Sequence, residues 1–194
     1  MELSDFIKTL YYIGIVVWLA PPIRQFRTPL FYFYLILAFG DTISLAYGSI
    51  LGRSIPLGYY VVLSFLLIVS LTDKVIVRRN KYLILAIGVL LVIGLFFVRL
   101  ETSYYFILFA LLHSIIFFMI LKLFIMSYVN YSKINFFFLM LLFYQATALF
   151  KLLNMAIGFA DATAFFVITT IAQIIFGLYF SIVRADRSEF ITKL

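Results

Sequence analysis

Apolar residues in this chain gather in long runs that are separated by short polar stretches. A helix needs about 20 predominantly apolar residues to cross the hydrocarbon core of a bilayer. The runs therefore predict seven transmembrane helices, at approximately residues 6–20, 29–51, 55–72, 81–98, 103–129, 133–157 and 162–183. The predicted fold class is all-α: one polytopic seven-helix domain that covers residues 1–194.

Proline and glycine mark several of the boundaries between these runs. Pro21-Pro22 is predicted to end the first helix, and Pro29 fits the first turn of the second. Gly158 is predicted to end the sixth helix. The first run is the shortest and the third is among the next shortest, so the limits of these two are the least defined by the pattern.

Composition excludes a water-soluble domain and several kinds of chemistry. The chain is 66% hydrophobic and 12% charged, with a mean hydropathy of +1.18, whereas soluble domains are about half apolar and a quarter charged. It has no cysteine and one histidine, which excludes disulfides, thiolate metal sites and multi-histidine metal sites. No metal and no cofactor are predicted. The acidic start, Met-Glu-Leu-Ser-Asp, does not resemble a signal peptide, so the first apolar segment is expected to remain as a helix.

Basic residues are distributed unequally between the two sets of loops. Cytoplasmic loops of membrane proteins carry an excess of Lys and Arg. With the N-terminus outside and the C-terminus in the cytoplasm, the cytoplasmic set is Arg24, Arg27, Lys74, Arg78, Arg79, Lys81, Lys122, Lys133, Arg184, Arg187 and Lys193. The outer set is Lys8, Arg53, Arg99 and Lys151. The net charge of +7 is thus explained by membrane topology and not by nucleic-acid binding, and the predicted location is the bacterial cytoplasmic (inner) membrane.

The first three predicted helices align with the last three at a constant shift of 105 residues without a gap. Phe31-Tyr32-Phe33 then falls on Phe136-Phe137-Phe138, and Thr42 falls on Thr147. One interpretation is a 3+1+3 arrangement of parallel repeats, which is a known plan of transporters. The other is the general similarity of apolar helices to one another.

Four polar residues fall near the middle of their predicted helices: Asp41, His113, Gln145 and Gln173. At 1.5 Å per residue each lies about 15–18 Å from a helix end, so they are predicted to share one layer. Ionisable groups at this depth are costly and are functional candidates by default. Asp41 is either a protonatable group, cation site or substrate anchor, or a neutral acid whose hydrogen bonds hold helices together.

The other polar candidates also have two interpretations each. His113 is either a proton relay with Asp41 or a neutral histidine bonded to a neighbouring helix, and the second is favoured. Lys151, in the outer half of the sixth helix, either pairs with Asp41 or an anionic headgroup, or extends to the outer interface. Gln145 lies about 100° round the helix from Tyr144, so Gln145 and Lys151 need not share a site. Gln173 shares a face with small and hydroxyl residues that are typical of helix packing.

Two resemblances to known families accompany this pattern. The Arg24–Arg27 loop, the segment Leu37-Ala-Phe-Gly-Asp-Thr-Ile-Ser44 and the near absence of a tail resemble small, uncharacterised seven-helix bacterial membrane proteins. Gly40-Asp41 and Ala172-Gln173 are similar to pairs in the YhhN-type lysoplasmalogenase family, which implies a membrane lipid hydrolase. The chain departs from that family in lacking a histidine soon after Gly40-Asp41 and a late Ser-Asp pair.

Three functions follow as hypotheses from different classes. The leading one is a non-enzymatic membrane module, a sensor or a membrane subunit, which predicts a stable protein partner in addition to the bilayer. The second is a small-solute transporter or proton-coupled channel that uses the mid-membrane layer. The third is a lipid-modifying hydrolase with Asp41 and His113 as acid and base. The sequence names no ligand, oligomeric state or partner.

Overall fold

The computed structural model describes residues 3–97, 101–186 and 191–192 as helices, two very short strands and their connections. The helices are α1 (Leu3–Trp18), α2 (Ala20–Arg24), α3 (Phe31–Leu51), α4 (Gly58–Leu71), α5 (Lys74–Arg79), α6 (Lys81–Phe97), α7 (Thr102–Tyr131), α8 (Phe136–Ile157) and α9 (Ala162–Ile182). The strands β1 (Ile134–Asn135) and β2 (Ile191–Thr192) pair antiparallel. The all-α prediction is confirmed. The predicted basic residues Arg99, Arg187 and Lys193 lie outside the described residues.

Five helical segments among these residues are long and apolar enough to cross a membrane. They are Asp5–Arg24, which joins α1 to α2, and the helices α3, α7, α8 and α9. Two further apolar helices are shorter: α4 has 14 residues, or about 21 Å, and α6 has 17, or about 26 Å. Each of the seven predicted segments therefore corresponds to an apolar helix, whereas seven membrane crossings remain a prediction.

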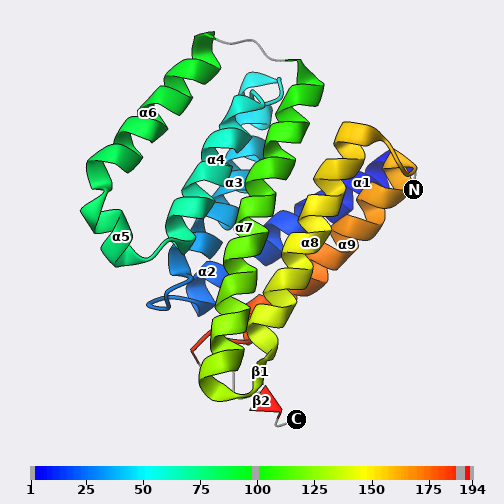
Figure 1. Cartoon of the computed structure of the whole chain (residues 1–194). Helices are drawn as coiled ribbons and strands as arrows, with labels where there is room; N and C mark the ends of the chain where they lie inside the picture. Colours follow the sequence, from blue (N-terminus) through cyan, green and yellow to red (C-terminus); the bar gives the residue numbers. More distant parts are fainter. Residues whose placement is uncertain (1–2, 98–100, 187–190, 193–194) are drawn as a thin grey trace.

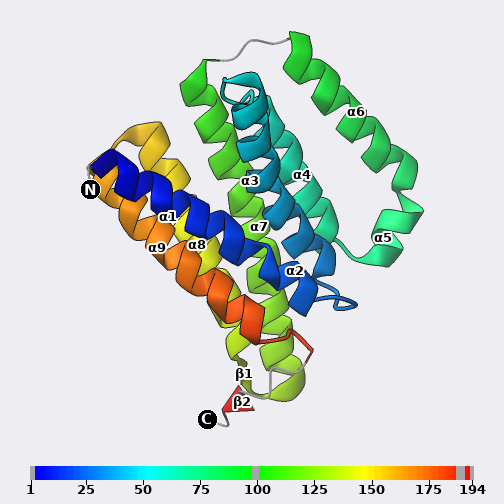
Figure 2. The same ribbon diagram turned by 180° about the vertical axis from the view of Figure 1, so that it is seen from behind.

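Six of the apolar helices form a closed ring, and the seventh lies outside it. Going round the ring, α1 packs against α9, α9 against α8, α8 against α7, α7 against α4, α4 against α3, and α3 against α1. The helix α6 packs against α4 on the outer side of the ring and stands apart from the others (Figures 1 and 2). Any internal site of the protein is therefore formed by the six ring helices.

Local sequence explains where several of these helices begin and end. The first helix was predicted to stop at Pro21-Pro22, but the chain turns after Trp18 and both prolines enter the first turn of α2, where a missing backbone N–H costs nothing. Gly158 ends α8 in a left-handed conformation with φ +69°, as predicted. Asp161 caps the next helix, because its Oδ1 accepts a 2.7 Å hydrogen bond from the backbone N–H of Ala164.

The core is densely aromatic and lies toward the end of the ring that holds α2 and the beginning of α8. Trp18, Tyr34, Phe137, Tyr144 and Phe180 form one group of contacting rings, all at most 7% exposed. Edge-to-face and tilted contacts of this kind add stabilisation beyond burial of area. This aromatic core closes one end of the ring.

Helix α1 approaches α9 very closely at Gly177. A Cβ atom on Gly177 would lie 2.7 Å from Val17 Cγ1 and 3.2 Å from Trp18 Nε1. The indole Nε1 donates a 3.2 Å hydrogen bond to the backbone carbonyl of Gln173, one turn earlier on α9. The absence of a side chain at Gly177 thus allows the Trp18 ring to lie against the α9 backbone.

Gln25 fastens α2 to the end of α9. Its side chain is completely buried, and Nε2 donates to the carbonyls of Phe180 (3.2 Å) and Val183 (2.7 Å). The backbone N–H of Ala185 donates to Gln25 Oε1 at 3.0 Å. Two arginines add hydrogen bonds between the same segments. Arg24 Nε donates to a carbonyl at the end of α9, and Arg184 donates to a carbonyl after α2. These bonds close the ring below the aromatic core.

Candidate functional site

Two adjoining cavities lie inside the helix ring, with volumes of about 390 Å³ and 130 Å³. Seven residues line both: Tyr11, Leu37, Asp41, Tyr144, Lys151, Phe166 and Gln173. They come from α1, α3, α8 and α9, and the larger cavity continues to α4 and α7. A single internal site therefore receives side chains from all six helices of the ring.

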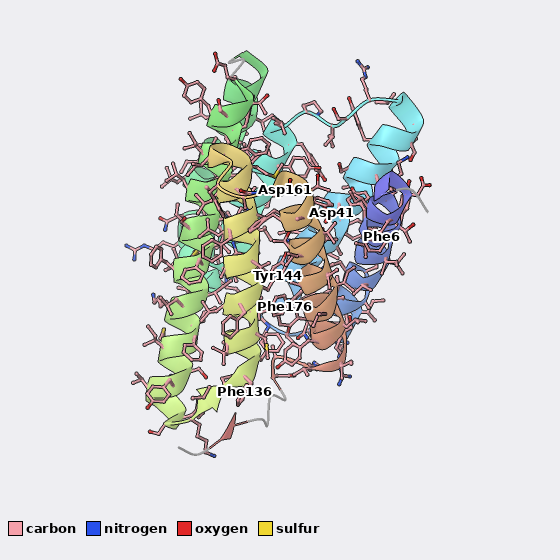
Figure 3. All side chains as sticks on the ribbon, turned by 90° about the vertical axis from the view of Figure 1, so that its right-hand side faces the viewer. Phe6, Asp41, Phe136, Tyr144, Asp161 and Phe176 are labelled. Carbon is pink, nitrogen blue, oxygen red and sulfur yellow. The ribbon has the colours of Figure 1, made fainter. Side chains whose placement is uncertain are left out.

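The larger cavity occupies the end of the ring opposite the aromatic core. Its wall includes Leu57, directly before α4, Phe106 in the second turn of α7, and Met155 near the end of α8. Figure 3 shows Asp41 nearer to Asp161 than to Phe136, with Tyr144 and Phe176 at intermediate depth. The cavity thus begins near the connections at one end and stops at the aromatic rings.

Asp41 lies at the middle of α3, about 15 Å from either end of that helix. Asp41 is solvent-accessible. Because ring helices surround it, this accessible surface faces the cavities that it lines. The preceding residue, Gly40, allows α4 to approach, because a Cβ there would lie 2.9 Å from Leu63 Cδ1. Asp41 is therefore an accessible carboxyl group inside the ring.

Several tyrosine side chains lie near this carboxyl group. Tyr11, Tyr60 and Tyr144 line the larger cavity together with Asp41, and the Tyr59 hydroxyl reaches the preceding residue, Gly40. Two of them are held by other groups on α3. The Tyr60 hydroxyl shares a 2.7 Å hydrogen bond with Ser44 Oγ, and the Tyr59 hydroxyl donates to the carbonyl of Gly40 at 3.2 Å.

Lys151 faces Asp41 across the cavities from α8. Both side chains line both cavities, but their charged atoms lie farther apart than the 4 Å of an ion pair. Within the described residues such a pair joins Arg184 to Asp186. The Lys151 Nζ lies 4.2 Å from the centre of the Phe166 ring, a cation–π arrangement. Lys151 therefore points along the cavity wall, and its ammonium group has no carboxylate in direct contact.

His113 and Gln145 form a bonded pair at the edge of the site. Gln145 is 1% exposed, and its Nε2 lies 2.7 Å from His113 Nδ1 and donates to the His113 carbonyl at 3.2 Å. The imidazole also lines the larger cavity that Asp41 lines. Gln145 is thus the neighbouring-helix partner that the helix-bonding interpretation of His113 requires. Among the described residues, no hydrogen bond joins His113 to Asp41.

Gln173 and Thr170 complete the site on α9. Gln173 lines both cavities, and Thr170 lines the smaller one. Thr170 is 5% exposed, and its Oγ1 has no hydrogen-bond partner among the described residues. Because the Oγ1 atom itself is enclosed, the rest of the Thr170 residue forms this part of the cavity wall.

The five residues singled out from the sequence come together as one group. Asp41, His113, Lys151 and Gln173 line the larger cavity, and Gln145 is bonded to His113. The tyrosines and Phe166 were not expected in the site, because aromatic residues in apolar helices usually face lipid or the interface. For Tyr144 the sequence did contain a signal, because Tyr144 and Lys151 are spaced to lie on a similar face of α8.

The described residues contain no group of three or more His, Cys, Asp or Glu side chains that could hold a metal ion. Comparison with known proteins finds no matching family model, no matching curated protein and no matching solved structure. The function is therefore argued from the site alone.

Proposed function

We propose that this chain is an integral membrane carrier for a small polar solute, with the solute bound between Asp41 and Lys151. The observation that carries the proposal is an accessible cavity inside the helix ring that contains both charges. Burial of two uncompensated charges in hydrocarbon is costly. A polar cavity that they line removes this cost and offers a binding site.

The proposed topology has seven crossings, an outer N-terminus and a cytoplasmic C-terminus in the bacterial inner membrane. The α2–α3, α4–α5 and α7–α8 connections lie toward one end of the molecule, and the α3–α4 and α8–α9 connections lie at the other (Figure 1). The first group contains Arg27 and Lys133 and flanks the basic helix α5, as the positive-inside rule requires of a cytoplasmic end. The cavity then opens toward the outside.

Parallel repeats would suit this function, and two features support them. Helix α3 begins at Phe31 and α8 at Phe136, which are 105 residues apart. Exchange of α1, α3 and α4 with α7, α8 and α9 also preserves the order of neighbours round the ring. In this interpretation α6 links the halves, and Asp41 and Lys151 come from the corresponding helices of opposite halves.

A carrier must open its site to one side of the membrane at a time, often by rocking of two halves. The cavity is closed at its inner end by the aromatic core and, beyond it, by the Gln25 hydrogen bonds. We therefore interpret this arrangement as an outward-facing state. Inward opening would require the α2–α9 contacts to separate and the α3–α4 end to close.

The sensor or subunit hypothesis shares the binding site and differs in its output. A sensor would bind the solute and change a protein partner without net transport. The hydrolase hypothesis requires Asp41 and His113 to act on one substrate. The carrier is preferred to it because the His113 Nδ1 is engaged with Gln145.

Transport into proteoliposomes tests the proposal. The purified chain is reconstituted and exposed to isotope-labelled sugars, polyols, amino acids, betaines, amines and carboxylates, with protein-free liposomes as the blank. We expect uptake of at least one class, and loss of that uptake in Asp41→Asn. The control Lys122→Met removes an exposed charge of α7 that does not line the site and should transport normally. If no class is taken up above the blank, the carrier proposal is wrong.

A further inference from the structure

We propose that the solute is a zwitterion with an apolar body, of the amino-acid type, whose ammonium group binds Asp41 and whose carboxylate binds Lys151. This inference rests on the proposed function, because it assigns the chemical class of the solute to the same cavity. Its basis is the presence of two opposite charges in one cavity, at a separation that excludes direct pairing.

The Asp41 end has the chemistry to hold an ammonium group. The carboxyl group attracts the cation, and Tyr11, Tyr60 and Tyr144, which line the same cavity, offer hydroxyl oxygens and aromatic rings there. Aromatic side chains bind ammonium groups through their ring faces. A carboxylate of the ligand at this end would instead meet a like charge.

The Lys151 end has the chemistry to hold a carboxylate. The ammonium group lies over the Phe166 ring and has no acidic partner within 4 Å among the residues that the structure describes. A carboxylate bound beside Lys151 in the cavities that it lines would give this ammonium group an ionic partner.

The balance of charge selects against solutes with a single charge. Asp41 and Lys151 line the same two cavities, so a cation bound at Asp41 alone would be repelled by Lys151, and an anion bound at Lys151 alone would be repelled by Asp41. A zwitterion that is oriented head to tail compensates both charges at once. The site therefore favours the zwitterion over either singly charged analogue.

The rest of the larger cavity suits an apolar body. Its wall includes Leu57, Leu63, Phe106, Phe109, Leu152 and Met155. The volume of about 390 Å³ falls in the range of small-molecule pockets, roughly 300–1,000 Å³. An aliphatic or aromatic side chain of an amino acid could be placed against this wall while both charged groups reach their partners.

Equilibrium binding of three matched probes to the full chain in detergent tests the inference. Phenylalanine is the zwitterion, 2-phenylethylamine lacks its carboxylate, and 3-phenylpropionate lacks its ammonium group. We expect phenylalanine to bind at least about 10-fold more tightly than either analogue, because a charged hydrogen bond contributes about that factor or more. A parallel series of leucine, isoamylamine and 4-methylpentanoate covers an aliphatic body.

Two charge-removing variants give a pattern that misfolding cannot produce. In Lys151→Met the preference should move to the amine, and in Asp41→Asn it should move to the carboxylate, with zwitterion affinity about 10- to 100-fold lower in each. The control Lys122→Met should keep the wild-type order of affinities. Retained binding of the favoured analogue shows that each variant is folded.

The outcomes separate this inference from the proposed function. Equal affinity for zwitterion and amine, or unchanged affinity in Lys151→Met, would overturn the zwitterion assignment. Uptake of a sugar or a polyol in place of amino acids would also overturn it and would leave the carrier proposal standing. Tight binding of phenylalanine or leucine without uptake in liposomes would support the inference and overturn the carrier in favour of a sensor.

Discussion

Replacement of Gln25 by alanine should lower the stability of the protein more than its position in a loop between arginines suggests. The side chain is completely buried and takes part in three hydrogen bonds with the backbone of Phe180, Val183 and Ala185. Each bond contributes about 0.5–1.5 kcal/mol net, and a partner left buried without a bond costs about 1–3 kcal/mol. We therefore expect a loss of about 2–4 kcal/mol.

Thermal unfolding in detergent, followed by intrinsic fluorescence, measures this loss. Trp18 is the only tryptophan in the sequence and packs on Phe180, a residue whose carbonyl Gln25 binds. For a chain of this length the expected loss corresponds to a decrease in Tm of roughly 5–15 °C. The loss of stability should therefore be visible in the fluorescence of Trp18.

A matched glutamine provides the control. The side chain of Gln173 makes no hydrogen bond to another described residue. The bond from Trp18 goes to the backbone carbonyl of Gln173 and would survive the substitution. Gln173→Ala should therefore change the free energy of unfolding by no more than about 0.5 kcal/mol. Gln25→Glu keeps the acceptor for Ala185 but places an oxygen against two carbonyls, so it should be at least as unstable as Gln25→Ala. If Gln25→Ala unfolds within 2 °C, or about 0.5 kcal/mol, of the wild type, the assignment of these bonds as a stabilising contact is wrong.

Three further perturbations test the packing, the site and the topology. Gly177→Ala should cost about 1–3 kcal/mol by overpacking in a thermal melt, whereas Gly14→Ala, whose Cβ would meet an atom at 3.9 Å, should be neutral or stabilising. Gln145→Leu should lower solute affinity less than Asp41→Asn in a binding titration, because it removes a bond to the α7 histidine and no charge; an equal loss would contradict this order. Because the chain lacks cysteine, Ser54→Cys should react with an impermeant maleimide in intact cells, and Val75→Cys only after permeabilisation; the reverse result would invert the proposed orientation.

The helices could be predicted well because their signal is local. Apolar run length located all seven segments, and Gly158 marked the end of α8 as predicted. Length alone did not reveal that α4 has only 14 residues or that the prolines at 21 and 22 begin a second short helix instead of ending the first. Both differences concern helix ends, where side-chain packing and capping act in addition to hydropathy.

The site could be predicted only in part because it depends on the order of helices round the ring. Depth along each helix placed Asp41, His113 and Gln173 in one layer, and these three do line one cavity. Depth could not show that Gln145 would bond to His113, or that the Thr170 hydroxyl would have no hydrogen-bond partner in the described part of the chain. Gln25 was missed altogether, since a glutamine between basic loop residues carries no signal of burial.

The contrast between the two ends of the ring connects packing to the proposed function. At the end that holds α2, α1 packs closely on α9 at Gly177, the aromatic rings pack against one another, and backbone hydrogen bonds hold the Gln25 side chain. Nearer the middle of the ring, Asp41 on α3 and Lys151 on α8 line one cavity without forming an ion pair. A ligand that joins these two charges also joins the two halves of the ring, so its binding energy favours states in which α3 and α8 are close. That coupling of ligand binding to the separation of two helices is what a carrier needs in order to close its outer end around its solute.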